Sequence, residues 1–189
     1  MNIRQLLPSR IDHRAARLLA VAAVGLAGVG ATAGGAQADS GGYAVSWSSP
    51  YLITASYDLL NVAVSDGSTS GGAPIIQWPA DGGGEQVWLF GTETLDGVYQ
   101  GTFIENGNSG LCLNTDGVAG DQLDQENCYF GNGNELFSVN GNLGSYDSFT
   151  NVGSGLNLDV NGYSWNEGAP IDLWYSNDQP NQTFETVPW

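Results

Sequence analysis

From residue 39 onward, hydrophobic and polar residues alternate over short stretches, and no stretch has the 3.6-residue period of an amphipathic helix. Three segments share one pattern: a short apolar strand, a turn rich in Gly, Asn and Asp, a second strand, and a closing triplet that ends in an aromatic residue. The first strands are 59–62, 111–115 and 156–160, and the second strands are 74–78, 122–126 and 170–174. The triplets are 86–88, 135–137 and 182–184. This pattern predicts an all-β fold built from three related units.

The closest internal match lies between residues 72–88 and residues 168–184. Both segments begin Gly-Ala-Pro-Ile, share a Trp and a Gln at matching places, and end on an aromatic residue. We expect the closing aromatics, Trp88, Phe137 and Phe184, to be core residues, one in each unit.

The strands of the third unit predict a division between core and surface. Successive side chains of a strand point to opposite faces of a sheet. One set is apolar and is predicted to face the core: Leu158, Val160, Ile171 and Leu173. The alternating set is predicted to face solvent on one rim: Asp159, Asp172 and Trp174.

Together these motifs resemble the ricin-type β-trefoil lectins. The resemblance rests on a Leu-Asp-Val strand, a Gly-x-Pro strand that ends in Trp, and a Gln-x-Trp closure, which is complete at 86–88 and degraded in the other two triplets. It covers residues 51–189 and implies a β-trefoil of three pseudo-symmetric repeats, at about 51–98, 99–145 and 146–189. Residues 39–50 form a short N-terminal segment.

The resemblance also implies a sugar site in the third repeat. Asp159 would accept two sugar hydroxyls, Trp174 would stack on the apolar face of the ring, and Asn181 would bind a further hydroxyl. Gln182 would hold Asp159 in place. Asp172 stands at a position that the family often fills with Gln.

The other two repeats depart from this pattern. In the first repeat, Asn61 replaces the Asp and Glu85 replaces the Asn, while Trp78 and Gln86 remain, so these four residues form a second candidate carbohydrate site. Ile76 takes the polar position, and the inward direction expected for Gln77 suggests a register shift at a bulge.

In the second repeat, Asn114 replaces the Asp, and Glu126 stands where the stacking aromatic belongs. With no aromatic surface for a sugar ring, we expect this repeat to have a structural role.

The N-terminus has the features of a secretory signal peptide over residues 1–38. Four Arg residues precede an apolar run rich in Ala and Gly, and Ala-Gln-Ala precedes Asp39. We therefore expect cleavage after Ala38 and a secreted, extracellular protein.

Cleavage would change the charge of the chain. The whole chain has 20 acidic residues, four Arg, no Lys and one His, for a net charge of −16. All the Arg residues and His13 precede the cleavage site, whereas Asp12 is the only acidic residue that does. The remaining chain has no basic side chain, which argues against nucleic acid, anionic membranes and polyanionic glycans as partners. It also excludes histidine-based catalysis, and we expect no metal or other cofactor and no membrane insertion.

Cys112 and Cys128 are the only cysteines, and in an exported chain a disulfide between them is the default. The family resemblance implies the same pairing, because its members often join a Cys of the first strand to one after the second strand within one repeat.

Three functional classes remain. The first is a lectin for neutral glycans or polysaccharide, of galactose type by resemblance. The second is a protein-binding or inhibitor β-trefoil, because a fold does not fix a function. The third, a glycosidase, needs two carboxylates at a set separation across a cleft, and an acidic chain offers such pairs by chance. We therefore expect a protein that is not an enzyme.

Overall fold

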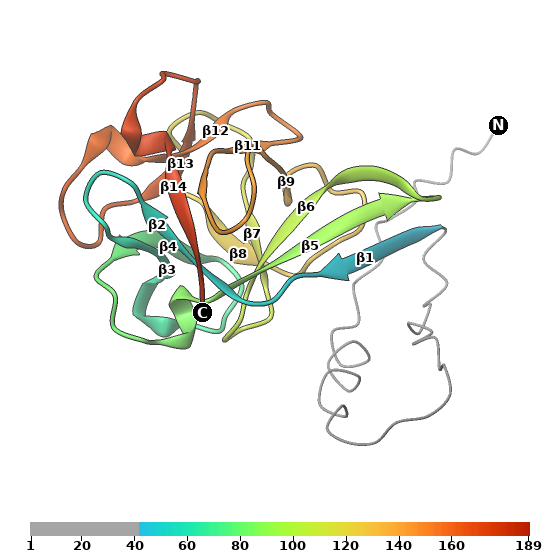
Figure 1. Ribbon diagram of the computed structural model, residues 1–189, viewed down its shortest axis with the longest axis horizontal. Helices are drawn as coiled ribbons and strands as arrows, with labels where there is room; N and C mark the ends of the chain where they lie inside the picture. Colours follow the sequence, from blue (N-terminus) through green and yellow to red (C-terminus); the bar gives the residue numbers. More distant parts are fainter. Residues whose placement is uncertain (1–41) are drawn as a thin grey trace.

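The computed structural model describes residues 42–189, which form an all-β fold (Figure 1). The predicted signal peptide lies outside the described residues. The strands are β1 (Tyr43–Trp47), β2 (Tyr51–Ala55), β3 (Asn61–Val64), β4 (Ala73–Trp78), β5 (Trp88–Leu95), β6 (Val98–Asn106), β7 (Cys112–Asn114), β8 (Asp124–Glu126), β9 (Leu136–Val139), β10 (Tyr146–Asp147), β11 (Phe149–Asn151), β12 (Asn157–Val160), β13 (Ile171–Trp174) and β14 (Phe184–Pro188). Single 3-10 turns are η1 (Ser65–Gly67), η2 (Gly84–Gln86), η3 (Asn161–Tyr163) and η4 (Pro180–Gln182). Within this described part, no helix is long and apolar enough to cross a membrane.

Each predicted strand pair forms an antiparallel hairpin, namely β3–β4, β7–β8 and β12–β13. The hairpins share one register, in which Asn61 pairs with Trp78, Cys112 with Glu126, and Asn157 with Trp174. Because side chains alternate between faces, a shared register places equivalent residues of the three hairpins in equivalent environments.

The core confirms the predicted apolar set. Leu158, Val160, Ile171 and Leu173 are fully buried, and so are the three closing aromatics, Trp88, Phe137 and Phe184. The indole N–H of Trp88 donates to the carbonyl of Val62 at 2.9 Å, so the one closing Trp also satisfies its polar group.

A long ribbon extends the sheet beyond this core. Strands β1, β5 and β6 lie side by side and project from the rest of the domain (Figure 1). The Trp47 ring lies over Gly91, where an added Cβ would come within 2.5 Å of it. The missing side chain of Gly91 thus makes room for the indole, which also stacks on Phe103 with 6.5 Å between ring centroids.

One hairpin position links the hairpin to a later segment of its own unit in all three units. In the first and third hairpins, Asn61 and Asn157 donate to the side-chain oxygens of Gln86 and Gln182. In the second hairpin the equivalent residue is Cys112, and the expected disulfide to Cys128 is present, with 5.2 Å between the Cα atoms. Closing a loop of 16 residues stabilises the fold by roughly 3 kcal/mol on the chain-entropy model.

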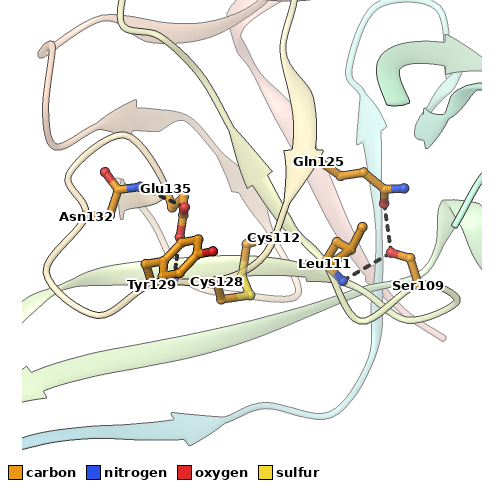
Figure 2. The surroundings of a disulfide bond; sticks show 8 residues. All are labelled: Ser109, Leu111, Cys112, Gln125, Cys128, Tyr129, Asn132 and Glu135. Atoms are coloured by element: carbon orange, nitrogen blue, oxygen red, sulfur yellow. Dashed lines mark hydrogen bonds between the residues drawn. A yellow bond between two sulfur atoms is a disulfide. The ribbon is translucent and has the colours of Figure 1, made fainter. Parts of the chain in front are cut away.

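Beside the disulfide, a buried carboxylate organises the loop that follows β8 (Figure 2). Glu135 accepts hydrogen bonds from the backbone N–H of Tyr129 at 2.6 Å and from the Asn132 amide at 2.7 Å. Burial raises the pKa of Glu135 to about 7, although both hydrogen bonds oppose the shift. The loop is therefore held by a carboxylate that takes up a proton near neutral pH.

The first prediction concerns stability against pH. Burial raises the pKa of Glu135 from 4.5 to about 7, and also raises those of Glu93 and Asp147. A carboxyl whose pKa is higher in the folded chain binds its proton more tightly there, so the free energy of unfolding falls as pH rises between the two pKa values. We expect urea denaturation to show decreasing stability from about pH 4.5 to about pH 7.

The variant Glu135→Gln tests the assignment, because a neutral side chain removes the contribution of this group to the pH dependence. We expect a shallower fall in stability over the same pH range. An unchanged slope in the variant would show that other carboxyls cause the effect.

Candidate functional site

The third hairpin brings the predicted sugar-site residues together. Asp159 on β12 lies directly opposite Asp172 on β13. The turn η4 carries Asn181 and Gln182 against them, and both amides donate to Oδ2 of Asp159, at 2.8 Å and 2.7 Å. Trp174 lies at the end of β13, two residues after Asp172 and therefore on the same face of the strand.

Further hydrogen bonds fix this cluster in place. Gln182 also donates to the carbonyl of Tyr175 at 2.9 Å, which holds the chain just after β13. Asn161 of η3 donates to Oδ2 of Asp172 at 2.6 Å. Two single-turn helices thus cover the end of the hairpin, and each supplies amide donors to one carboxylate.

The prediction that both carboxylates face solvent is wrong. Asp159 and Asp172 are 3% and 0% exposed, because the amides of η3 and η4 pack over them. Trp174, at 44% exposed, is the only one of the five predicted residues that reaches the surface. Strand alternation correctly predicts the face of the sheet on which the two carboxylates lie, but it does not predict the turns that cover this face.

Burial also leaves two acceptor atoms of the site without a hydrogen bond. Oδ1 of Asp172 and Oδ1 of Asn181 are buried and have no partner among the described residues. A buried acceptor without a donor costs about 1–3 kcal/mol. The site therefore lacks donors, which the hydroxyl groups of a ligand can supply.

The same burial changes the protonation of the site. Burial raises the pKa of Asp159 to about 6, the Gln182 and Asn181 amides oppose the shift, and the charge of Asp172 adds to it. Burial also raises the pKa of Asp172, against the hydrogen bond from Asn161.

The first repeat has a different site from the predicted one. In the shared register, Ala63 and not Asn61 is the equivalent of Asp159, and it pairs with Ile76 just as Asp159 pairs with Asp172. Asn61 is instead the equivalent of Asn157. The Leu-Asn pair at 60–61 and again at 156–157 is the sequence signal that gives the correct alignment.

Asn61 has an architectural role. It is buried, accepts the Thr54 hydroxyl at 2.8 Å and donates to Gln86 at 2.9 Å. Thr150 and Asn157 repeat the first of these contacts at 2.8 Å in the third unit. Gln86 is also buried and donates to the carbonyl of Pro79 at 2.8 Å, so both side chains have their hydrogen bonds satisfied within the first unit.

A cavity of about 480 Å³ lies at this position of the first repeat. Its apolar floor includes Ala63 and Ile76, and Trp78 forms one wall at 39% exposed. The rim carries three acidic side chains, Asp66, Asp81 and Glu85. Of the four predicted residues, Trp78 and Glu85 line this cavity.

The predicted bulge at Gln77 is absent. The β3–β4 pairing keeps its register from Asn61 to Val64, and Gln77 is buried in line with it. Its amide donates to the carbonyls of Ser164 and Asn166 at 2.9 Å and 3.0 Å, in the loop after η3. An inward glutamine thus joins the first hairpin to the third unit.

In the second hairpin, Asn114 and Asp124 occupy the positions of Asp159 and Asp172. They satisfy each other, since the Asn114 amide donates to Oδ1 of Asp124 at 2.8 Å. Glu126 occupies the position of the exposed tryptophans.

Comparisons with known proteins agree with this geometry. Residues 85–174 match the family described as ricin-type beta-trefoil lectin domain-like. Over these residues, the chain is similar to that family. A comparison with curated protein sequences found no match.

Three solved structures show the breadth of the fold. The designed threefold-symmetric protein ThreeFoil is 26% identical, with a TM-score of 0.64 over 74% of this chain and 99% of its own. The exo-β-1,3-galactanase of Clostridium thermocellum is 23% identical (TM-score 0.67), over 75% of this chain but only 30% of the galactanase chain. The ricin B-like lectin of Macrolepiota procera, solved with lactose, is 22% identical (TM-score 0.60), over 75% of this chain and 98% of the lectin.

The structural assignment of Asn61 gives a second prediction. Asn61→Ala removes the acceptor of the Thr54 hydroxyl and leaves the Gln86 amide oxygen with only the backbone N–H of Asp81 at 3.4 Å, and should lower the free energy of unfolding by about 2 kcal/mol. Urea denaturation measures the effect. Asn157→Ala, at the equivalent position of the third hairpin, should show a similar loss. Wild-type stability in both variants would refute this role.

Proposed function

We propose that this domain is a secreted lectin that binds neutral, galactose-type sugars through its third repeat, and that its three units form a pseudo-symmetric trefoil. It acts by binding, without catalysis. The observation that carries the proposal is an exposed tryptophan, Trp174, beside a cluster of carboxylate and amide oxygens that lacks hydrogen-bond donors. Secretion depends on the signal peptide expected over residues 1–38.

The chemistry of the third-repeat cluster fits a pyranose. The C–H face of the ring would stack on the Trp174 indole, as in other contacts of apolar surface with aromatic rings. Sugar hydroxyls would donate to Oδ1 of Asp172 and of Asn181, whose side chains must turn outward to receive them. The negative charge of the domain favours a neutral sugar over an acidic one. A fold neighbour solved with lactose, which contains galactose, supports this choice.

The first-repeat cavity is less suited to the same ligand. Ala63 and Ile76 replace the two carboxylates, and Glu85 replaces the amide of Asn181. The aromatic wall remains, but the oxygens that would orient hydroxyls at the floor of the site are missing.

The third prediction tests which tryptophan binds. Trp174→Ala removes an exposed ring without touching the buried network, and should weaken binding to galactose and lactose by roughly ten-fold, as expected for loss of a ring contact. Trp78→Ala is the matched control, because Trp78 holds the same register position in the first hairpin. Isothermal titration calorimetry measures both variants.

The outcomes separate the alternatives. If Trp78→Ala abolishes binding while Trp174→Ala does not, the sugar binds in the first repeat. If the wild-type domain binds no neutral glycan on an array, the protein-binding alternative replaces the lectin proposal.

The fourth prediction concerns the pH dependence of sugar binding. Ionised Asp159 accepts the Asn181 and Gln182 amides, so protonation disturbs the site as the pH falls through the raised pKa of about 6. We expect lactose affinity to rise with pH through this range and to level off above it. The free energy of unfolding of the domain should fall over an overlapping pH range. Asp159→Asn should bind weakly at every pH. A flat affinity profile in the wild type would contradict the role of Asp159.

A further inference from the structure

Two exposed aromatic side chains cluster around a half-buried tyrosine next to the third repeat. Tyr57, in the turn between β2 and β3, makes edge contacts with Tyr163 and Trp165, with 4.6 Å and 5.1 Å between ring centroids. The Tyr57 hydroxyl donates to the carbonyl of Ser164 and so ties the turn to this loop. Tyr163 is 38% exposed and Trp165 is 65% exposed. We call these three residues the aromatic platform.

The backbone at Tyr163 is held in an unusual conformation. Its φ angle is 56°, in the left-handed region that disfavours a bulky side chain. The equivalent residue of the first repeat is Gly67, with φ 60°, which adopts this region readily. The shared hairpin register establishes the equivalence, because η1 and η3 each follow the hairpin's first strand directly. The third repeat thus has an aromatic residue at a backbone position that favours glycine. Backbone strain of this kind points to a function.

The platform is connected to the third-repeat site through the turn η3. In the first repeat, Gly67 lines the cavity together with Ala63 and Trp78. By equivalence, Tyr163 borders the site of Asp159 and Trp174. Asn161, in the same turn as Tyr163, is hydrogen-bonded to Asp172 at 2.6 Å. Trp165 lies two residues beyond Tyr163 along the same loop.

We infer that the aromatic platform binds the next units of a neutral, linear glycan whose terminal sugar occupies the third-repeat site. This inference rests on the proposed lectin function and names its ligand class as an oligosaccharide rather than a monosaccharide. Exposed rings fixed by mutual edge contacts offer stacking surfaces at little cost in side-chain entropy. The acidic surface disfavours charged glycans here as in the main site.

Titration with galactose and with β-linked galacto-oligosaccharides of increasing length tests the inference. Wild-type affinity should rise with chain length. Trp165→Ala should bind galactose like the wild type but bind the longer chains roughly three- to ten-fold more weakly. Tyr163→Gly should also lose the rise of affinity with chain length. Glycine adopts the positive φ at this position readily, so unfolding of the variant would not account for the loss. Tyr146→Ala, which removes a ring 59% exposed on β10, is the control and should match the wild type.

Each other outcome is decisive. Equal length dependence in the wild type and in Trp165→Ala, or no length dependence in the wild type, would overturn the platform while leaving galactose binding intact. Loss of galactose binding in Trp165→Ala would also overturn it, because the ring would then support the main site. Failure of the wild-type protein to bind galactose or any oligosaccharide would instead reject the proposed function itself.

Discussion

The described domain must bury carboxylates without any cation to neutralise them. Residues 42–189 contain no Lys, Arg or His. Burying an ionised group is costly unless hydrogen bonds compensate for lost hydration. In this fold the donors are neutral. Glu135 accepts Asn132 and a backbone N–H, and Asp159 accepts Asn181 and Gln182. Neutral donors compensate less than a cation would, so the pKa values of these acids are raised.

The need to satisfy buried carboxylates with neutral donors affects both the architecture and the candidate site. The amides that hold the closing segments of the units are the same type of group that satisfies the buried acids. Gln182 does both, because it accepts from Asn157 and donates to Asp159. The second unit does not use this device, since Cys112 occupies the position of Asn157 and forms a disulfide with Cys128. The amide at this hairpin position does not depend on a carboxylate, because Asn61 keeps it in the first unit, where Ala63 and Ile76 replace the acidic pair.

The first repeat shows what happens when the carboxylates are lost. Ala63 and Ile76 replace the acidic pair, and a cavity with an apolar floor lies at this position. The left-handed turn beside it carries Gly67, whereas the third repeat carries Tyr163. The two repeats share a hairpin register but differ at this position, where the first has a cavity lined by acidic side chains and the third has a buried polar cluster beside the exposed Trp174. The fold is shared, and the side chains at a few register positions decide which ligand each repeat suits.

Much of this protein follows from local patterning in the sequence. Period-two alternation and the recurring aromatics are enough to identify an all-β fold and its core, because burial on one face of a strand is a local property. The disulfide follows separately from the presence of two cysteines in a chain expected to be exported. The grouping of Asp159, Trp174, Asn181 and Gln182 is implied by the family resemblance. The predicted alignment of the first repeat is wrong, because it matches Asn61 to Asp159, whereas strand pairing shows that Asn61 matches Asn157, as the Leu-Asn pairs at 60–61 and 156–157 indicate. Only the tertiary structure decided that Asp159 and Asp172 are buried and that Tyr57 meets Trp165, since both depend on turns that pack across units distant in sequence.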